Sequence, residues 1–502
     1  MAVVARETET KYELPAGAAL PSLDELPEVG ATAGADEQQL EAEYYDTDDL
    51  RLIRAGVTLR RRRGGDDAGW HLKLPEGAGT RLEIRLPLGR SGRQVPRELS
   101  ALVRAYARGA TLRPVARLTT RRQRLVLLDE AGESLAEVAS DDVSAQTMGD
   151  STTVSAWREV EVELTGGNGR LLKAADALLR RDGLRPAGRS AKLERALAGQ
   201  LPEPARSPRL TARAPAGQVV LAYLREQAEK LKALDPMVRR DEPDAVHQMR
   251  VTTRRLRAAL RSYRRLMRGT GHLAGELRWL GRVLGEARDA EVLPAHLRAG
   301  LDTVPVEQVL GPVRARLQVH FAPVTAQARD GVLAALDSGR YLSLLDELDQ
   351  VIAEPEFRPR AARPAGDVLP REVRRAYRKT ARRMKRAWRA GPQTQTRLHE
   401  ARKAAKRARY AGEAAALALG QPAARFTRKM KKVQSVLGDH QDTVIARQAE
   451  RDLGVEAGRA GENAFSYGLL YEREANIARA LRTKAASTWK DSSRSRYRTW
   501  MG

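Results

Sequence analysis

The sequence contains no cysteine among its 502 residues, which excludes disulfide bonds and thiolate metal sites. It also contains no apolar run long enough to span a membrane. Its first eleven residues, MAVVARETETK, lack the apolar stretch of a signal peptide. These absences predict a soluble cytoplasmic protein without membrane insertion, and the length predicts more than one domain.

Positive charge is concentrated in one part of the chain. The formal net charge is +25, from 89 Lys and Arg against 64 Asp and Glu. Residues 1–200 hold 30 basic and 31 acidic side chains, so residues 201–502 hold 59 and 33. The C-terminal part therefore has a field that attracts polyanions, which are nucleic acid, anionic lipid or polyphosphate.

The pattern of apolar residues changes near residue 200. Before it, polar and apolar residues alternate between Gly- and Asp-rich turns, which predicts antiparallel strands in a sandwich or barrel. These segments are 6–14, 57–63, 70–74, 81–86, 115–128, 134–138 and 157–164. After residue 217, apolar residues recur at steps of three and four, which predicts an all-α bundle. Its segments are 219–234, 244–267, 273–301, 309–336, 367–390, 393–418, 423–449 and 462–484. We expect an α+β multidomain chain with a first domain over 1–200, a linker over 201–217 and a helical domain over 218–502.

The helical part contains an internal repeat. One copy reads HQMRVTTRRLR at 247–257 and LGEARD at 284–289, and the other reads HEARKAAKRAR at 399–409 and LGDHQD at 437–442. The histidines that open the copies are 152 positions apart, and the glycines of the LG motifs are 153 apart. Two motifs in the same order at nearly the same offset predict two related helical halves, over about 218–355 and 365–490.

Basic side chains share one helix face in each copy. In the first copy, offsets of 0, 3, 7, 10 and 14 belong to His247, Arg250, Arg254, Arg257 and Arg261. In the second copy, the first four offsets recur at His399, Arg402, Lys406 and Arg409, with Lys403 and Arg407 beside them. A row of like charges repels itself, so we expect a chain of phosphates to lie along each face. The histidines can donate to phosphate, which would raise their pKa.

The LG motif of each copy supports these faces. Its glycines, Gly285 and Gly438, allow helices to approach closely, and its aspartates, Asp289 and Asp442, can hold basic side chains in place. A solvated basic face and a DNA-recognition helix are the other interpretations. The duplicated pattern disfavours the first, and the lack of a compact helix-turn-helix spacing disfavours the second. Non-specific nucleic-acid contact stays open on charge alone.

The two copies resemble the CHAD domain, an all-helical family named for its conserved histidines, over about 215–502. The resemblance implies two helical subdomains around a basic groove or pore, with inorganic polyphosphate as ligand and polyphosphate granules as location. The residues that would bind polyphosphate are His247, Arg250, Arg254, Arg257, His399, Arg402, Lys403, Lys406 and Arg409. The second copy departs from the first, because Asp439 and Asp442 enclose His440, and the role of His440 stays open.

A second charged pattern lies near the start of the chain. Glu7, Glu9 and Lys11 alternate with two threonines, so a strand would place the carboxylates and the lysine on one face. Adjacent carboxylates repel each other. A divalent cation such as Mg²⁺, which binds carboxylate oxygens and substrate phosphates, would resolve the repulsion. Lys11 beside them would suit a phosphate.

Charged residues also keep one parity on the other predicted strands. They are Arg60 and Arg62; His71 and Lys73; Arg81, Glu83 and Arg85; Arg117 and Arg121; and Glu159, Glu161 and Glu163. Such a polar face is either the outer surface of a sheet or the lumen of a barrel. For a generic sheet, the outer surface is favoured.

These strands together resemble the CYTH domain, a triphosphate tunnel fold, over roughly 1–200. The matching stretches are ETETK at 7–11, YYDTDDLRL at 44–52, VTLRRR at 57–62, WHLKLP at 70–75, WREVEVEL at 157–164 and SAKLERAL at 190–197. The resemblance implies an eight-stranded antiparallel barrel that binds triphosphates in its lumen with Mg²⁺ or Mn²⁺. The implied metal ligands are Glu7, Glu9, Glu159 and Glu161, with Asp141 as a further one. The implied phosphate ligands are Lys11, Arg60, Arg62, Lys73, Arg117, Arg121 and Lys192, while Glu83 would bind the metal or position a basic residue.

The combined resemblance predicts a polyphosphate-binding protein whose barrel is a metal-dependent inorganic triphosphatase, with Glu7, Glu9 and Lys11 in the catalytic group. Tripolyphosphate, a nucleoside triphosphate and thiamine triphosphate are the candidate substrates, and the tandem architecture favours an inorganic one. Metal and basic side chains would neutralise the transferring phosphoryl group while water attacks it. The alternatives are a non-catalytic protein on polyphosphate granules, an adenylyl cyclase and a nucleic-acid-binding protein. The expected partner is inorganic polyphosphate or tripolyphosphate, and non-specific nucleic acid is a further one.

Overall fold

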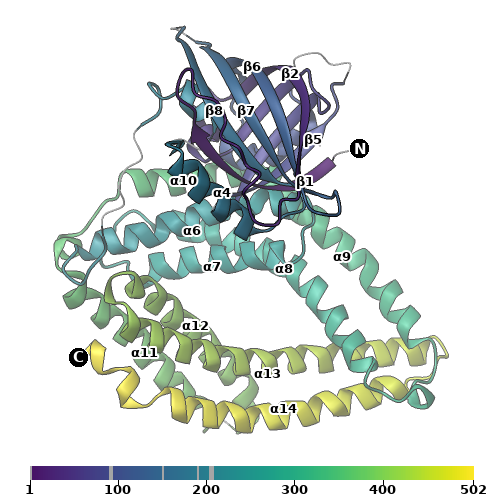
Figure 1. The fold of residues 1–502 in the computed structure, drawn as a ribbon. Coiled ribbons are helices and arrows are strands. Elements are labelled where there is room, and N and C mark those ends of the chain that lie inside the picture. The colour runs from purple at the N-terminus through teal and green to yellow at the C-terminus, as the bar shows by residue number, and fades with distance from the viewer. Residues whose placement is uncertain are drawn as a thin grey trace. The chain divides into compact units, whose positions relative to one another are not determined.

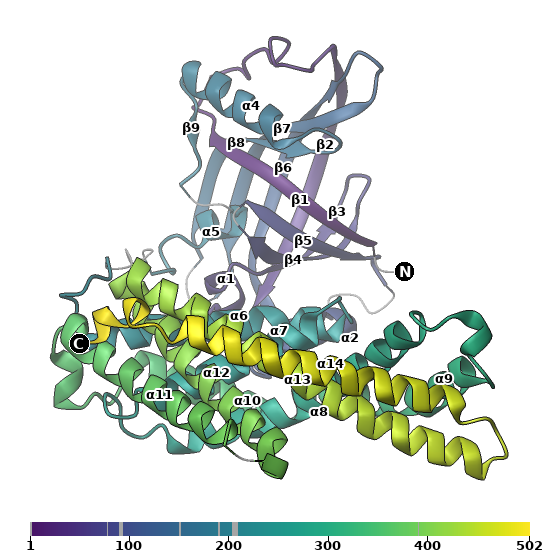
Figure 2. The same cartoon turned by 90° about the horizontal axis from the view of Figure 1, so that it is seen from below.

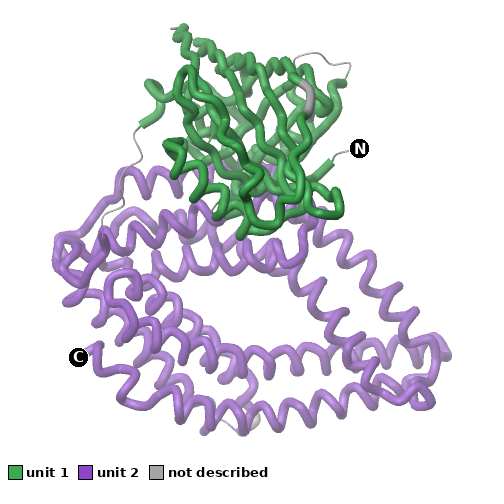
Figure 3. The backbone as a smooth tube through the Cα atoms, viewed as in Figure 1, with its two compact units in different colours: residues 1–206 green, residues 207–502 purple. Residues whose placement is uncertain are grey.

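The computed structural model describes residues 3–77, 79–89, 94–149, 152–188, 191–202, 209–389 and 391–502, with the backbone alone for residues 35, 36 and 392. The chain forms two compact units, Met1–Arg206 and Ser207–Gly502 (Figure 3). The expected linker over 201–217 falls partly on residues 203–208, which lie outside the described residues. The first helix of the second unit begins at Ala216, inside that expected linker.

Among the described residues of the first unit, eight antiparallel strands close into a barrel (Figure 1). They are β1 (Val3–Glu13), β2 (Ala31–Asp46), β3 (Thr58–Arg63), β4 (Gly69–Gly77), β5 (Thr80–Leu86), β6 (Arg113–Leu128), β7 (Ser134–Thr147) and β8 (Val154–Leu164). Their order is β5-β4-β3-β2-β6-β7-β8-β1, and β1 also pairs with β5, which closes the barrel. A two-residue strand, β9 (Arg185–Pro186), pairs with the end of β1. Closure leaves no long edge strand unpaired, and the predicted barrel is confirmed.

Short helices pack against the barrel. They are α1 (Arg51–Arg54), α2 (Arg97–Leu102), α3 (Arg104–Ala107), α4 (Gly169–Arg181) and α5 (Lys192–Ala196). Val160 and Val162 of β8 pack in one cluster with Leu171 and Leu179 of α4, and the outer faces of β4 and β5 pack with α2 and α3. Helix α5 packs instead against side chains of the lumen parity, such as Trp157, and its first residue, Lys192, lines the cavity. Because the apolar side chains of β4, β5 and the second half of β8 take the outer face, the charged parity of these strands turns into the lumen. The preference for an outer polar face therefore does not hold here.

Strand β2 is the main departure from the sequence-based expectation. Residues 31–46 read ATAGADEQQLEAEYYD, with few large apolar side chains and no regular alternation, so no strand is expected there. The segment pairs with β3 on one side and with β6 along most of its length on the other. Its strand conformation therefore comes from its neighbours in the sheet, not from local preference.

The second unit is all-helical (Figures 1 and 2). Its helices are α6 (Ala216–Arg239), α7 (Ala245–Ser262), α8 (Gly271–Leu301), α9 (Val313–Asp337), α10 (Gly339–Ala353), α11 (Ala365–Ala387), α12 (Thr394–Leu419), α13 (Gln421–Arg459) and α14 (Phe465–Ser492). The sequence-based expectation misses α10, which the side chain of Ser338 caps at its N-terminus. None of the described helices combines the length and hydropathy that a membrane crossing needs.

The two halves of the second unit meet where each half begins. The N–H of Ala216, at the start of α6, donates to the carbonyl of Arg363 (2.9 Å). The N–H of Ala365, at the start of α11, donates to the carbonyl of Ala214 (2.8 Å). This exchange is reciprocal, as two related halves would make it.

Helix α12 is tied to the first half by polar contacts. The carboxylate of Glu413 accepts from Tyr223 of α6 (3.1 Å) and from Arg255 of α7 (3.0 Å). The hydroxyl of Tyr263, just after α7, donates to the carbonyl of Ala411 (2.6 Å). These contacts fix α7 against α12, and α7 and α12 carry the two basic faces.

Candidate functional site

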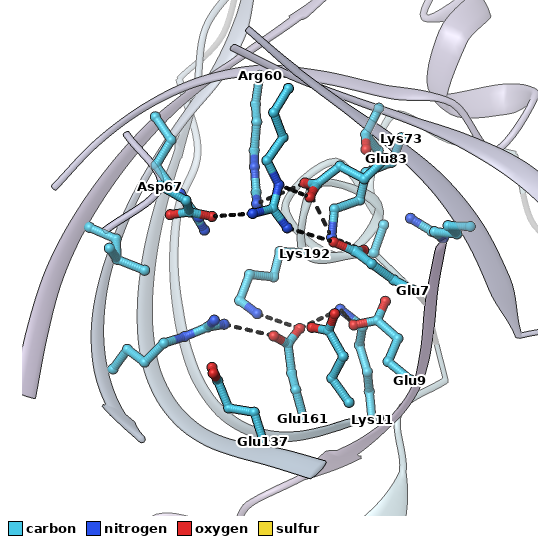
Figure 4. A pocket seen from close by; sticks show the side chains of 18 of the residues that line it. Glu7, Glu9, Lys11, Arg60, Asp67, Lys73, Glu83, Glu137, Glu161 and Lys192 are labelled. Carbon is cyan, nitrogen blue, oxygen red and sulfur yellow. Dashed lines mark hydrogen bonds and ion pairs between the residues drawn. The ribbon is translucent and has the colours of Figure 1, made fainter. Parts of the chain in front are cut away.

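The barrel encloses a cavity of about 330 Å³ (Figure 4). Its charged lining residues are Glu7, Glu9, Lys11, Arg60, Arg62, Asp66, Asp67, Lys73, Arg81, Glu83, Arg85, Arg122, Arg124, Glu137, Glu161, Glu163 and Lys192. The wall thus has nine basic and eight acidic side chains, so it is nearly neutral in sum although it is densely charged.

Three buried carboxylates gather around Lys192, and one of them, Glu161, lines the cavity together with Lys192. Asp141 of β7 and Glu159 and Glu161 of β8 each bring an oxygen within 4.8 Å of the other two. The ammonium of Lys192 lies 2.8, 2.7 and 2.6 Å from Asp141, Glu159 and Glu161. Burial opposes the charge of Lys192, but these carboxylates prevail and raise its pKa well above the usual range. Among the described residues, this acidic cluster is the group whose geometry suits a metal ion, and an ammonium now neutralises it.

Lys11 and Arg122 are two further cations that pair with the carboxylates of the acidic cluster. Lys11 pairs with Glu161 and lies 3.2 Å from Glu9. The guanidinium of Arg122 lies 2.7 Å from both Asp141 and Glu161. Burial would raise the pKa of Glu161, but the neighbouring cations lower it well below its usual range. A metal ion that displaced one of these cations would meet ionised ligands already in place.

Glu7 and Glu83 form a second acidic group (Figure 4). Lys73 pairs with Glu7 and lies 3.7 Å from Glu83, while Arg85 pairs with Glu83 and lies 3.6 Å from Glu7. Nδ1 of His71 lies 2.8 Å from Glu83, and its Nε2 lies 2.8 Å from a backbone carbonyl. Burial lowers the pKa of His71 to about 4, so the neutral ring can donate to one of these two acceptors. Glu83 is thus surrounded by basic groups, which supports a positioning role for it.

Arg60 and Arg62 project from β3 into the cavity. Arg60 donates to the hydroxyl of Tyr44 (3.3 Å), and Arg62 pairs with Asp67. Burial lowers the pKa of Arg62, and the positive charges of Arg60 and Arg122 lower it further. A buried arginine among other cations marks a place where an anion would be stabilised.

The structure corrects the predicted parity on β6. Arg117 and Arg121 do not line the cavity, because each pairs with a carboxylate of the outer face at 2.9 Å and their side chains are 45% and 61% exposed. Arg122 and Arg124 line the cavity instead. The adjacent arginines at 121 and 122 permit either parity, and pairing with β7 decides it by setting Arg122 opposite Asp141.

Glu137 and Glu163 are cavity residues that the sequence-based site leaves out. The strand register sets Glu163 opposite Glu9 on β1 and opposite Glu137 on β7. Burial is the largest cause that raises the pKa of Glu163 to about 7, and the negative charge of the nearby Glu7 adds to it. The shared parity of Glu163 with Glu161 is a sequence signal for the lumen, but the row of three carboxylates across the strands appears only when the strands are paired.

The second unit brings four basic side chains together, which we call the central basic cluster: Arg250 and Arg254 of α7 and Arg402 and Lys406 of α12. Burial is the largest cause that lowers the pKa of Lys406 to about 6, and the positive charges of Arg254, Arg402 and Arg250 lower it further. Burial, together with neighbouring cations, also lowers the pKa of Arg254 and of Arg402. The Nε atoms of both arginines are buried without a hydrogen-bond partner. Cations this close, with buried donors unused, form a place for a polyanion.

Each LG motif supports one arginine of the central basic cluster. A Cβ atom on Gly285 would lie 3.5 Å from a guanidinium nitrogen of Arg250, and one on Gly438 would lie 3.1 Å from a guanidinium nitrogen of Arg402. Arg250 also donates to Asp289 (3.0 Å). The glycines therefore leave room for the arginines, and Asp289 lies where it can hold Arg250.

Replacing Gly438 with alanine should weaken polyanion binding about three- to tenfold, a loss of up to about 1.4 kcal/mol. The added Cβ, 3.1 Å from the guanidinium, would displace Arg402. Gly285→Ala is the matched control, because its contact of 3.5 Å is ordinary, and it should change binding less than about twofold. Titration with long-chain polyphosphate measures both effects, and an equal loss in the two variants would contradict this account.

Arg409 lies outside the central basic cluster, which corrects its assignment to the polyphosphate ligands. Its guanidinium donates to Glu413 (2.8 Å) and Gln434 (2.9 Å), so it is held in an internal network. Arg257, the counterpart in the first copy, lies among cations. Burial lowers its pKa, and the positive charge of Arg261 lowers it further. The sequence holds the distinguishing signal, since Glu413 comes four residues after Arg409 whereas Arg261 comes four residues after Arg257.

The repeated histidines lie near these cations. Burial lowers the pKa of both rings. The positive charge of Arg288 lowers the pKa of His247 further, and that of Lys403 lowers the pKa of His399 further. Nδ1 of each ring is buried without a hydrogen-bond partner, so each neutral ring keeps a nitrogen for a ligand. His440 differs from them, because it is buried and the charge that acts on it comes from α14.

Family models match both units. The CYTH domain model matches residues 5–189, and the CHAD domain model matches residues 222–451. Two Mycobacterium tuberculosis proteins, uncharacterized protein MT2285 of strain CDC 1551 and uncharacterized protein Rv2226 of strain H37Rv, are each 38% identical to this chain, over 95% of this chain and 94% of the relative. The chain belongs to the CYTH–CHAD proteins. Its barrel is a CYTH domain and its helical unit contains a CHAD domain, which confirms both resemblances.

Solved structures match parts of the chain. PptA from Streptomyces chartreusis covers 55% of this chain and 100% of its own length, with 19% identity and a TM-score of 0.47. The CHAD domain from the plant Ricinus communis covers 56% of this chain and 96% of its own, with 26% identity and a TM-score of 0.44. A Hippeastrum protein described as a putative adenylyl cyclase with a dominant triphosphatase activity covers 39% and 98%, with 17% identity and a TM-score of 0.25.

Proposed function

We propose that the CYTH barrel hydrolyses inorganic triphosphate with Mg²⁺ or Mn²⁺ and that the CHAD domain binds polyphosphate. The observation that supports the barrel activity is the acidic cluster of Asp141, Glu159 and Glu161, which suits a divalent cation and reaches the cavity wall through Glu161. The same wall carries arginines and lysines suited to phosphate oxygens. Charged side chains make up most of this wall, and Leu40, Tyr44 and Ala191 are its few apolar or aromatic members. A nucleoside or thiamine ring would need more apolar contact, so an inorganic substrate fits better.

Charge balance supports a requirement for metal. The nine basic and eight acidic side chains of the wall nearly cancel, and Asp141 and Glu159, which Lys192 contacts, add two further carboxylates. A triphosphate carries several negative charges, and burying them without compensation is strongly unfavourable. One or two divalent cations would supply the missing positive charge.

The residues of the acidic cluster and of the cavity wall divide into two roles in this proposal. The cation would be held by Asp141, Glu159 and Glu161, with Glu9 beside them, and phosphate oxygens would be bound by Lys11, Arg60, Arg62 and Lys73. When bound, the metal ion would stabilise negative charge on the transferring phosphoryl group. Arg60 and Arg62 would orient the phosphates, since each guanidinium offers parallel donors. Glu7 would orient Lys73, with which it pairs.

The full chain should release phosphate from tripolyphosphate with Mg²⁺ or Mn²⁺ and should stop after chelation. Glu9→Gln should lower the rate about ten- to a hundredfold, because the change removes a carboxylate beside the acidic cluster. Glu41→Gln, at an exposed position of β2, is the matched control and should keep the wild-type rate. A wild-type rate in Glu9→Gln would contradict the assigned site, and cyclic AMP made from ATP without phosphate release would point to a cyclase.

The central basic cluster supports polyphosphate as the ligand of the CHAD domain. Its four basic side chains come from two helices, and buried donors of Arg254 and Arg402 lack partners. A slim chain of linked phosphates can reach several of these cations at once, whereas the phosphates of a nucleic-acid duplex lie on a wide rod. Competition between polyphosphate and duplex DNA at fixed salt tests this preference, and location at polyphosphate granules is expected if polyphosphate wins.

Polyphosphate binding should take up protons near pH 7. Because the pKa of Lys406 is lowered to about 6, this side chain is mostly neutral at that pH in the free protein. Phosphate favours the ammonium form, so affinity should rise as the pH falls from about 8 to 6. The unfolded chain binds this proton up to the ordinary lysine pKa of about 10.4, so the stability of the free protein should rise with pH between about 6 and 10. Calorimetry in buffers of different ionisation enthalpy measures the uptake, and an undiminished uptake in Lys406→Gln would contradict the assignment.

A non-catalytic barrel is the second candidate, and one observation favours it. Lys192, Lys11 and Arg122 already neutralise the acidic cluster, so a barrel that never exchanged these cations for metal would only clamp phosphates. Binding of tripolyphosphate without phosphate release, with every metal tested, is the result that would select the clamp.

A further inference from the structure

A basic groove of about 230 Å³ lies in the CHAD unit, where the end of α7 meets α11 and α12. We call it the outer basic groove. Six of its nine described lining residues are basic, and they are Arg261, Arg264, Arg265, Arg375, Lys379 and Arg407. The acidic member of this lining, Glu372, already accepts from Arg375 at 2.7 Å. The outer basic groove therefore has a large excess of positive charge.

Three of these cations, Arg261, Lys379 and Arg407, come from three different helices and form no ion pair with a carboxylate of the described residues. The charges that act on two of them are positive. The charge of Arg407 is the largest cause that lowers the pKa of Lys379, and burial lowers it further. Burial lowers the pKa of Arg407, and the positive charges of Arg261 and Arg383 lower it further. The repulsion in the groove is thus uncompensated, and an anion would relieve it.

The internal repeat shows where a carboxylate is replaced by a cation. At the offset of 152 positions that relates the repeated histidines, Arg407 corresponds to Arg255. At the same offset, Arg261 corresponds to Glu413. The carboxylate of Glu413 pairs with Arg255 (3.0 Å) and with Arg409 (2.8 Å). The related place in the outer basic groove holds the guanidinium of Arg261 instead. A bound anion there would do for Arg407 what Glu413 does for Arg255.

A row of cations connects the outer basic groove with the central basic cluster. Arg254, Arg257 and Arg261 follow one another on α7 at steps of three and four residues, so they share one helix face. The positive charges of Arg261 and Arg254 are among those that add to burial in lowering the pKa of Arg257. From Arg254 to Arg261 the helix rises by about 10 Å. Arg257 thus lies between the two places and interacts with cations of both.

We propose that the outer basic groove binds the phosphates of a polyphosphate chain that continues beyond the central basic cluster. This binding rests on the proposed polyphosphate affinity of the CHAD domain and adds a requirement for chain length. Arginine and lysine donors suit phosphate oxygens, and the row along α7 gives the chain a continuous series of cations. Tripolyphosphate held at the central basic cluster would be too short to reach Arg261, Lys379 and Arg407 as well. A long chain would therefore gain contacts that tripolyphosphate lacks.

Titration of the full-length chain with long-chain polyphosphate and with tripolyphosphate tests this continuation. Arg261→Gln/Arg407→Gln is expected to weaken the binding of long-chain polyphosphate about five- to thirtyfold, because two charge contacts are lost. Its affinity for tripolyphosphate should stay within about twofold of the wild-type value. Its melting temperature should be no lower than that of the wild type, because the changes remove a repulsion.

The matched control is Arg451→Gln/Arg459→Gln, which removes the same number of charges at exposed positions of α13. It should change the affinity for either ligand less than about twofold. The barrel is the same in every variant, so its own affinity for phosphates cancels in these comparisons.

Three results would overturn the proposal. An unchanged affinity of Arg261→Gln/Arg407→Gln for long-chain polyphosphate would make the groove a solvated surface. An equal loss for both ligands would make it a general anion site, and a larger loss with duplex DNA at the same salt would assign it to nucleic acid. Failure of the proposed polyphosphate binding is distinguishable, because it would appear in the wild type as an absence of binding or in Arg254→Gln/Lys406→Gln as an unchanged affinity.

Discussion

Replacing Arg254 and Lys406 with glutamine is expected to weaken polyphosphate binding by about 10²- to 10⁴-fold. Each change removes a charge-assisted contact worth about 1.5–3 kcal/mol, and about 1.4 kcal/mol corresponds to a factor of ten. The same changes should stabilise the free protein, because burial and neighbouring cations already lower the pKa of both side chains. Loss of binding with a gain in stability is typical of residues kept for function.

Titration with long-chain polyphosphate at fixed salt measures the affinity of this double variant, and thermal melting measures its stability. The matched control replaces two basic side chains elsewhere in the unit, the exposed Arg314 and Arg479, with glutamine and should change binding less than about threefold. If the control loses as much affinity as the double variant, net charge and not the central basic cluster determines binding.

Lys192→Met is expected to destabilise the metal-free barrel by about 3–5 kcal/mol and to make its stability depend on divalent cations. Lys192 is buried, and its ammonium lies between 2.6 and 2.8 Å from Asp141, Glu159 and Glu161, so its removal leaves these carboxylates without their shared partner. Mg²⁺ or Mn²⁺ could then replace the ammonium, because the ligand oxygens already lie within 4.8 Å of one another. In the wild-type protein, Lys192 would compete with the metal, so its gain should be smaller.

Thermal melting with Mn²⁺ and with chelator measures this dependence. The expected result is a larger metal-induced rise in melting temperature for Lys192→Met than for the wild type. Arg121→Met, on the outer face of the same barrel, is the control and should respond to Mn²⁺ as the wild type does. A destabilised Lys192→Met that no divalent cation rescues would argue against metal binding at the acidic cluster.

The sequence predicts the second unit well where the signal is local. The basic pattern from His247 to Arg257 lies within one helix, and its period can be read directly. The approach of Arg254 to Arg402 cannot be read in this way, because it depends on how α7 packs against α12. Arg409 lies between these cases. Glu413, four residues later on the same helix, allows the ion pair to be predicted from the sequence, and this ion pair holds Arg409 outside the central basic cluster.

In the barrel, parity along a single strand is a weaker signal than helix periodicity. Arg121 and Arg122 are adjacent, so alternation places one of them in the lumen without saying which, and the pairing of β6 with β7 decides. The carboxylate row through Glu9, Glu163 and Glu137 appears only when three strands are aligned. Long-range pairing therefore determines the features that the sequence alone does not reveal.

The reciprocal hydrogen bonds at Ala216 and Ala365 have the form of an isologous dimer contact, in which each partner offers the other the same donor and the same acceptor. A chain that held one half alone would thus present a surface complementary to its own copy. Fusion of the halves makes this association intramolecular. The two basic faces then stay assembled at any protein concentration, however dilute the protein becomes.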